Sequence, residues 1–335
     1  YAVAPFRVKK DDGTPYRVFT PFYKSWVIHG WRKPAPKFKK EPNWIKPLKN
    51  EGRPKVKSDI EIPKAGEKNA LDLFTKFLKN GIKEYDQNRN RPDLEGTSKL
   101  SIPLRFGEIH PRTILAELND SKDHDTYRKE ICWREFYAEV LATAPESETQ
   151  SLDQKWELMG WDLEKDYKQK LKIWQEGKTG FPLVDAGMRQ LKDSGWMHNR
   201  VRMVVASFLV KDLHIHWRHG ANWFMKHLLD GDIASNSHGW QWTAGCGTDA
   251  SPYYRIFNPM MQAEKFDPNA EYVRKWIPEL RHLKGINAHT PWDQVDGYKN
   301  GYLERMVDHQ VERDETLRRY KASKGEKVIK EKFSR

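Results

Sequence analysis

The segment GTSKLS at residues 96–101 brings several small hydroxyl side chains into one turn, directly before a helix candidate at residues 103–108. Hydroxyls and free backbone N–H groups in such a turn can hold a phosphate without a glycine-rich loop. Turns of this composition are also common helix caps. The segment therefore favours either a phosphate site or an ordinary helix start.

A second segment, TYRKEICWREFYAEVL, places four chemically capable side chains at helical spacing. Tyr127, Glu130, Arg134 and Tyr137 follow one another at intervals of three, four and three residues, and Trp133 borders them. Residues at this spacing share one face of a helix. Aromatic rings beside a carboxylate suit a planar ligand that stacks and donates hydrogen bonds. The alternative is an amphipathic helix with an internal Glu130–Arg134 ion pair.

A third segment, GWMHNRVRMVVASFL, repeats the pattern with different groups. Trp196, Asn199 and Met203 recur at intervals of three and four, with Arg202 beside them. A ring, an amide and a thioether therefore converge on one side of the predicted helix.

The loop LLDGDIASNSHGWQW follows that helix and supplies two carboxylates, Asp230 and Asp232, and then three further side chains: Asn236, Trp240 and Trp242. Two carboxylates in an aromatic neighbourhood are costly unless a cation or a hydrogen-bond donor meets them. We expect Arg202 to meet one carboxylate and a heterocycle with N–H groups to meet the other.

The elements that position these groups are predicted to be mostly α-helical. From Leu71 onward apolar residues recur three and four apart, and alternating strand-like segments are scarce. Prolines and lysines at residues 31–68 predict an extended connector, and the lysine-rich residues 313–335 predict a frayed or disordered basic tail. The expected organisation is a segment with its connector at 1–68, a helical catalytic domain at 69–312 and the tail at 313–335.

Composition narrows the class of partner. The 335 residues carry a formal charge of +12 and a sequence pI near 9.4, which favours a polyanion such as nucleic acid. No run approaches the roughly 20 apolar residues that a membrane span needs, so we expect a soluble, intracellular protein with no membrane partner. Cys132 and Cys246 belong to no metal-type cluster, so we expect free thiols and no metal site. GxGxxG, GxxxxGK[ST] and HExxH motifs are absent.

The order and spacing of the motifs resemble the photolyase and cryptochrome family, closest to the class I cyclobutane pyrimidine dimer photolyases. The resemblance runs from about residue 12 to about residue 280 and is carried by DGTPYRVFTPF, YDQNRNRPDLEGTSKLS, CWREFY, WQEGKTGFPLVDAGMRQL, WMHNRVRM and DGDIASNSHGWQWTAGCGTDASPYYRIFNP. It implies an all-helical domain that binds FAD and repairs DNA as a deoxyribodipyrimidine photo-lyase.

The resemblance also implies a role for individual residues. Positions that line the FAD diphosphate and ribose are Tyr85, Thr97, Ser98, Lys99, Leu100 and Ser101. Positions around the flavin and adenine are Tyr127, Trp196, Asn199, Arg202, Asp230, Gly231, Asp232 and Asn236, with Asn236 at the flavin N5 edge. Positions that receive the flipped dimer are Glu130, Trp133, Asn199, Met203 and Trp242. Positions that face the DNA are Arg134, Tyr137, Arg200, Arg255 and Gln262.

The implied mechanism is light-driven electron transfer from reduced FAD to the dimer, whose ring splits before the electron returns. Oxidised flavin would be photoreduced through Trp240, then Trp217, then Trp161. Nothing in this chain resembles the α/β antenna domain that family members carry before this segment, so no antenna pigment is assigned to these residues.

Two residues depart from the family pattern: Tyr127 stands where tryptophan is frequent, and His238 where glycine is common. The alternatives within the fold are a signalling cryptochrome and a photolyase for (6-4) photoproducts; outside it, a helical DNA-binding module without cofactor. Asn236, where plant receptors carry aspartate, and Asn199, where a second histidine would follow His198, favour dimer repair. The expected partner is damaged DNA and the expected state is a monomer. The compartment would be the nucleoid-containing cytoplasm of a prokaryote, or the nucleus or an organelle of a eukaryote.

Overall fold

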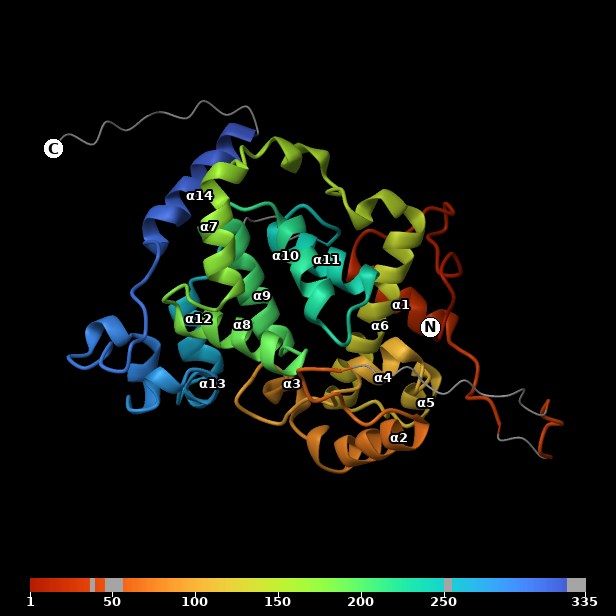
Figure 1. The fold of residues 1–335 in the computed structure, drawn as a ribbon. Coiled ribbons are helices and arrows are strands. Elements are labelled where there is room, and N and C mark those ends of the chain that lie inside the picture. The colour runs from red at the N-terminus through yellow and green to blue at the C-terminus, as the bar shows by residue number, and fades with distance from the viewer. Residues whose placement is uncertain (37–39, 46–56, 250–254, 324–335) are drawn as a thin grey trace.

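The computed structural model describes residues 1–36, 40–45, 57–249 and 255–323, and these residues form helices and connecting loops without a strand (Figure 1). This confirms the mostly α prediction. In chain order the α-helices are α1 (Phe19–His29), α2 (Glu67–Lys76), α3 (Tyr85–Asn88), α4 (Ser101–Phe106), α5 (Pro111–Ala116), α6 (Lys122–Thr143), α7 (Glu164–Gln175), α8 (Pro182–Ser194), α9 (Asn199–Ser207), α10 (Trp217–His227), α11 (Ile233–Ala244), α12 (Pro259–Phe266), α13 (Glu271–Trp276) and α14 (His309–Ser323). Two π-helical turns, Phe77–Gly81 and Phe208–Asp212, extend α2 and α9.

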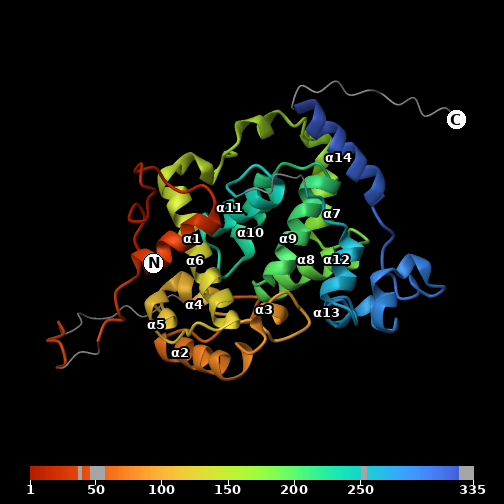
Figure 2. The same cartoon turned by 180° about the vertical axis from the view of Figure 1, so that it is seen from behind.

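Two clusters of buried apolar side chains form the core. One cluster joins the N-terminal segment, α1, α2, α5 and α6 from Tyr127 to Val140, and includes the fully buried Trp26 and Phe136. The other joins α7 to α11 with the C-terminal elements, and includes the fully buried Trp174 and Phe208. In Figures 1 and 2 the first cluster's helices lie on one side of the molecule and α12 to α14 on the other, with α10 and α11 between them.

Helix α11 is the meeting point of the two halves, because it packs against α6, α9 and α10. Its approach to α10 is close at Gly220, where an added Cβ would overlap ring atoms of Trp240. Glycine at this position lets the two helices lie against each other with the tryptophan ring between them. The sequence segments predicted to carry chemistry therefore lie on helices that touch.

The N-terminal segment packs against the catalytic helices. The Trp26 indole on α1 donates to the Glu135 carboxylate on α6 at 2.7 Å, and the backbone N–H of Val3 donates to the same side chain at 3.1 Å. The described part of the predicted connector, up to residue 65, contains no helix after α1. The boundary at residue 68 stays a prediction, and α2 begins at Glu67, just before it.

The predicted C-terminal tail differs from the structure. Residues 313–323, expected to be frayed, form most of α14, and Thr316 is 1% exposed. Arg319 donates to the Gly160 carbonyl and pairs with Asp162, each at 2.8 Å. Apolar periodicity failed to predict this helix because buried polar contacts hold it. Residues 324–335 lie outside the described residues.

No helix in the described ranges combines the length and apolar character of a membrane span. Both cysteines, Cys132 and Cys246, are free and buried. Burial raises the pKa of each thiol, which favours the protonated form.

Candidate functional site

The hydroxyl-rich turn before α4 is tied to α6. The Tyr127 phenol donates to Ser98 Oγ at 3.0 Å, and Ser98 Oγ also accepts from the Leu100 backbone N–H at 3.3 Å. Lys99 has a left-handed backbone with φ of 53°, and Leu100 anchors the turn with 1% exposure. Burial raises the pKa of the Tyr127 phenol, so this donor keeps its proton. Ser101 begins α4, and Thr97 is half-buried before it.

The carboxylate of Glu130 pairs outside its own helix. Arg89, just after α3, contacts Glu130 at 2.7 Å, whereas Arg134 donates to the Leu104 carbonyl at 3.2 Å. The internal Glu130–Arg134 ion pair considered from the sequence is therefore wrong. Burial raises the pKa of Glu130 and Arg89 opposes that rise. The side chain is still 27% exposed, so a ligand can reach it.

Aromatic contacts fix the planes of the rings on α6. Trp133 stacks on Phe19 of α1 with centroids 3.7 Å apart and an interplanar angle of 5°. Tyr137 lies 5.3 Å from Trp133 and stacks on His238 of α11 at 5.6 Å. One face of Trp133 is thus covered, and a substrate ring can stack only on its other face.

The Arg202 guanidinium on α9 meets the Asp230 carboxylate, as predicted. Arg202 Nη2 donates to Asp230 at 2.8 and 3.1 Å, and Arg202 Nε donates to the Met197 carbonyl at 2.8 Å. Asp230 is 8% exposed, so this pair neutralises a buried charge. Asp232 instead caps α11 by accepting from the Ser235 backbone N–H at 2.8 Å.

Side-chain contacts join the hydroxyl turn to the segments that follow α8. The Trp196 indole donates to Ser101 Oγ at 3.3 Å, and Arg105 Nε donates to the Gly231 carbonyl at 2.5 Å. The Tyr85 ring meets the Tyr127 ring edge to face at 5.2 Å. The structure therefore brings the three predicted segments into one site.

The start of α9 presents one accessible polar side chain, Asn199, beside the buried His198. Asn199 is the exposed first residue of that helix, and Met203, one turn further, is half-buried. His198 caps the helix through Nδ1, which accepts from the Arg200 backbone N–H at 3.2 Å. Burial lowers the pKa of His198 to about 3, so the imidazole is neutral.

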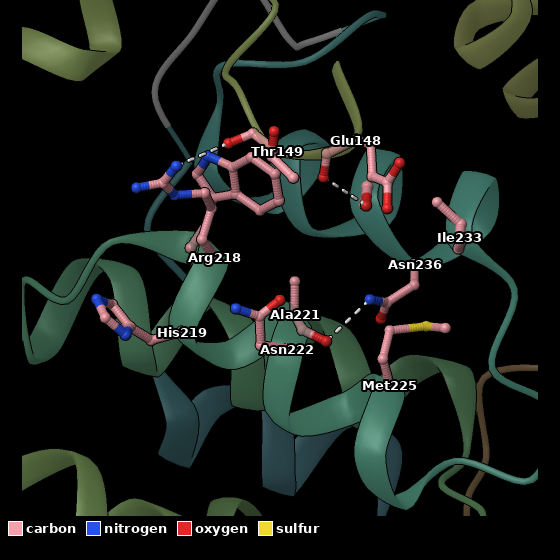
Figure 3. Close-up of a pocket in the computed structure, with 11 residues that line it drawn as sticks. Glu148, Thr149, Arg218, His219, Ala221, Asn222, Met225, Ile233 and Asn236 are labelled. Atoms are coloured by element: carbon pink, nitrogen blue, oxygen red, sulfur yellow. Dashed lines mark hydrogen bonds between the residues drawn. The ribbon is translucent and has the colours of Figure 1, made fainter. Parts of the chain in front are cut away.

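Asn236 points from α11 toward α10. Its amide donates to the Ala221 carbonyl at 3.0 Å, at the edge of a cavity of about 230 Å³ between these helices and residues 148–149 (Figure 3). The labelled side chains of Arg218 and His219 come from α10, and Arg218 donates to the Thr149 carbonyl at 3.2 Å. The amide of Asn236 is thus held in place by the neighbouring helix.

The predicted tryptophan series has two buried members and ends at a half-buried one. Trp240 is 3% exposed, Trp217 is 1% exposed, and Trp161 is half-buried. Trp240 packs on α10 at Gly220, one turn after Trp217, and meets Trp174 at 6.2 Å and Phe224 at 5.0 Å. The prediction did not include Trp174, although its motif, WQEGKTGFP, was identified.

The predicted DNA-facing residues lie on several elements. Arg200 donates to the Asn90 amide oxygen at 2.7 Å and lies 4.3 Å from the Phe266 ring. Gln262 is half-buried on α12 and Arg255 is exposed. Trp242 is half-buried on α11. Sequence analysis missed Arg89 and Phe19, which hold Glu130 and Trp133, although both lie within quoted motifs or beside them.

These helices bring hydroxyls, an ion-paired carboxylate and aromatic rings together, and comparisons with known proteins identify the class of protein. A family model described as the FAD binding domain of DNA photolyase matches residues 127–322. The chain belongs to the DNA photolyase family.

Individual relatives agree with this assignment. The chain is 41% identical to a deoxyribodipyrimidine photo-lyase of Escherichia coli, with 96% of this chain and 71% of that relative covered. The crystal structure of a class III photolyase from Agrobacterium tumefaciens matches with a TM-score of 0.82 at 37% identity, covering 97% of this chain and 72% of that one. A cryptochrome from Synechocystis matches with a TM-score of 0.76 at 29% identity, covering 90% and 68%.

The donor groups fit FAD, the cofactor of this family. Ser98, Ser101 and the ammonium of Lys99 suit a diphosphate, and Lys99 Nζ lies 5.9 Å from the Trp196 ring. The Arg202–Asp230 pair and the Asn236 amide offer donors and acceptors to ring heteroatoms. Within the described ranges, His, Cys, Asp and Glu side chains form no group of three or more that could hold a metal.

Proposed function

We propose that this chain repairs cyclobutane pyrimidine dimers in DNA, using light and FAD. The observation that carries the proposal is the packing of α11 against both α6, which carries Glu130 and Trp133, and α9, which carries Arg202. Arg202 in turn pairs with Asp230, just before α11. FAD, bound in its reduced form, would supply the electron that splits the cyclobutane ring and takes it back afterwards. The names of the relatives, deoxyribodipyrimidine photo-lyase and photolyase, support this reaction.

The residues assigned to the cofactor would bind its diphosphate and orient its rings. The hydroxyl turn and Lys99 would bind the diphosphate. Tyr127 would hold the turn through its hydrogen bond to Ser98, and the Tyr85 ring would pack against the Tyr127 ring. Around the rings, Arg202 would hold the orientation of the Asp230 carboxylate. The remaining positions assigned to the cofactor are Thr97, Leu100, Ser101, Trp196, Asn199, Gly231, Asp232 and Asn236.

The substrate residues would bind the flipped dimer. Trp133, backed by Phe19, offers one open ring face, and Glu130 offers a carboxylate oxygen to a base N–H. Asn199 is an exposed amide at the start of α9 that can pair with a base edge. Met203 and Trp242 would complete the pocket. A damaged dinucleotide is cheaper to unstack than an intact one, which supplies part of the selectivity.

The DNA backbone would lie across the half-buried Arg200 of α9 and the exposed Arg255 that follows α11. Arg200 presents its guanidinium from the α9 terminus while Asn90 and Phe266 hold its orientation. Guanidinium groups grip phosphates and fix the register of the duplex. The other positions assigned to this surface are Arg134, Tyr137, Arg255 and Gln262.

Photoreduction of oxidised flavin would use the tryptophans. Trp240 would give up the first electron, Trp217 would replace it, and Trp161 would be the terminal donor. The increase in exposure from Trp240 and Trp217 to Trp161 supports this direction. We further infer a monomer that acts wherever the cell keeps its DNA, with the domain boundaries predicted from the sequence.

The experiment is repair of a dimer-containing oligonucleotide by the chemically reduced holoprotein under blue light. Restoration of intact thymines in light and not in darkness is expected. A yellow protein that binds the damaged DNA but leaves the dimer intact would refute repair. Turnover of (6-4) photoproducts in place of dimers would assign the other photolyase activity.

A further inference from the structure

The aromatic contacts around His216, the residue before α10, connect the last two tryptophans of the proposed relay. The His216 ring lies 5.2 Å from the Trp161 ring at 76° and 5.7 Å from the Trp217 ring at 33°. One imidazole therefore touches both indoles. Its exposure is 9%, so protein surrounds it, and bulk water does not separate the rings.

Hydrogen bonds hold both indoles against this imidazole. Trp217 Nε1 donates to Ser151 Oγ at 3.1 Å, and Trp161 Nε1 donates to the Trp156 carbonyl at 3.0 Å. The backbone beside Trp161 is tied down by Arg319 of α14, which donates to the Gly160 carbonyl at 2.8 Å. Each tryptophan thus has a fixed ring plane facing His216.

His216 is itself fixed at the start of α10. Its Nδ1 accepts from the Arg218 backbone N–H at 3.2 Å, and its Nε2 lies 3.2 Å from the Glu157 carboxylate. Burial lowers the pKa of His216; Glu157 opposes this, whereas Arg218 and His219 add to it. A neutral ring places no positive charge between two indoles that would each carry a radical cation in turn.

We propose that His216 is a positioning residue of the relay, whose ring bridges Trp217 and Trp161 during the last electron transfer. The inference rests on the proposed function, because it requires the tryptophan relay. In this step Trp161 loses one electron and becomes a radical cation, and the Trp217 radical cation regains one and becomes neutral. His216 gains and loses nothing. An external thiol later gives one electron to Trp161 and becomes a thiyl radical, releasing its proton to water.

Two substitutions separate the bridge from the helix cap. His216→Asn keeps a side chain that caps helices well but removes the ring. His216→Phe keeps a ring but removes the cap. If the ring bridges, His216→Asn slows photoreduction of the oxidised holoprotein about tenfold, and His216→Phe stays within about twofold of the wild type. His219→Ala, whose ring contacts Tyr167, is the matched control and leaves the rate unchanged.

Transient absorption then locates the radical. The wild type and His216→Phe are expected to form a long-lived radical on the half-buried Trp161, whereas His216→Asn keeps the radical on buried Trp217, where it recombines quickly. Trp161→Phe should reproduce the short lifetime. In the same holoprotein kept dark, Trp161→Phe should also shift the NMR signals of the His216 ring, since ring contact produces a ring-current shift.

The outcomes distinguish this inference from the proposed function. Equal photoreduction by His216→Asn and wild type, or equal slowing in both His216 variants, overturns the bridge. Chemically reduced His216→Asn should still repair dimers at the wild-type rate, because His216 touches none of the residues proposed to bind the dimer. If the chemically reduced wild type fails to repair dimers, the proposed function is refuted. The photoreduction rates of the wild type and the two His216 variants still test the bridging role of His216.

Discussion

Glu130 is the residue where the proposed chemistry is most directly testable. We expect Glu130→Gln to weaken binding of dimer-containing DNA about 10- to 100-fold, since a hydrogen bond to a charged group contributes roughly 1.5–3 kcal/mol. FAD content should not change, because Glu130 contacts Arg89 and not the hydroxyl turn. Titration of labelled damaged duplex, with the flavin-to-protein absorbance ratio, measures both.

A neighbouring carboxylate supplies the control for Glu130. Asp125, on the same helix, pairs with Lys129 at 2.7 Å and faces Tyr23. Asp125→Asn should leave damaged-DNA affinity unchanged. Release of flavin by Glu130→Gln, with affinity retained, would place Glu130 on the cofactor side.

For single residues, the sequence predicted side-chain contacts within a motif or between neighbouring motifs better than contacts between distant segments. The Arg202–Asp230 pair could be predicted because a buried carboxylate requires a cation and Arg202 lies beside the site. The Arg89–Glu130 and Phe19–Trp133 contacts could not, because each joins elements whose relative placement depends on the whole fold. Helical spacing predicted which side chains share one face of α6, but not which residues of other elements contact that face.

At the scale of elements, the α10–α11 contact depends on Gly220. We expect Gly220→Ala to lower the free energy of unfolding by about 1–3 kcal/mol, because the new methyl overlaps the Trp240 ring and must displace it. Photoreduction should slow in the same variant, since Trp240 moves relative to Trp217. Urea unfolding of the holoprotein measures the first effect and absorbance under light the second.

Gly239, on α11, is a matched control for Gly220. An added Cβ there meets nothing within 4 Å. Gly239→Ala should therefore be neutral or stabilise the helix by up to about 1 kcal/mol, the ordinary gain of alanine over glycine. Equal destabilisation by both substitutions would mean that loss of glycine, and not ring overlap, is responsible.

Helix α14 is held by a buried acid and histidines. His309 Nδ1 lies 2.5 Å from Asp212 Oδ1, and His214 Nε2 lies 2.5 Å from Glu312. The sequence predicted a frayed tail because α14 has few large apolar residues. Polar pairs that become buried only when distant segments meet give no periodic signal, so this helix could not be predicted from local pattern.

Asp212 makes the docking of α14 depend on pH. Burial raises the pKa of Asp212 to about 6, and His309 opposes the rise. The folded state then holds the Asp212 proton more tightly than the unfolded state does. Protonated Asp212 therefore adds to the free energy of unfolding below about pH 4, and this contribution is lost as pH rises through 6. Asp212→Asn cannot ionise, so its free energy of unfolding should rise by about 2–3 kcal/mol relative to that of the wild type as pH goes from 4 to 7.

Urea unfolding of the two proteins across that pH range checks this expectation. Asp314→Asn is the control, because Asp314 lies on the exposed side of α14 and pairs with Arg313. If the difference in free energy of unfolding between the wild type and Asp212→Asn does not vary with pH, then Asp212 does not titrate in this range.

At the scale of the whole molecule, the excess of cations should govern DNA affinity. The formal charge is +12, and Arg255 is an exposed member of the proposed DNA surface. Binding to damaged duplex should weaken with salt at a log–log slope of about −0.9 per phosphate neutralised. Arg255→Ala should make that slope shallower by about one, because one phosphate contact is lost.

The same titrations separate charge from recognition. Lys168→Ala, at an exposed position of α7 paired with Glu164, removes one charge away from the proposed surface and should leave the slope unchanged. Glu130→Gln should lower affinity for damaged duplex at every salt concentration without changing the slope, because its partner is a base and not a phosphate. A slope near zero for the wild type would mean that the basic surface does not hold the duplex, whatever the pocket recognises.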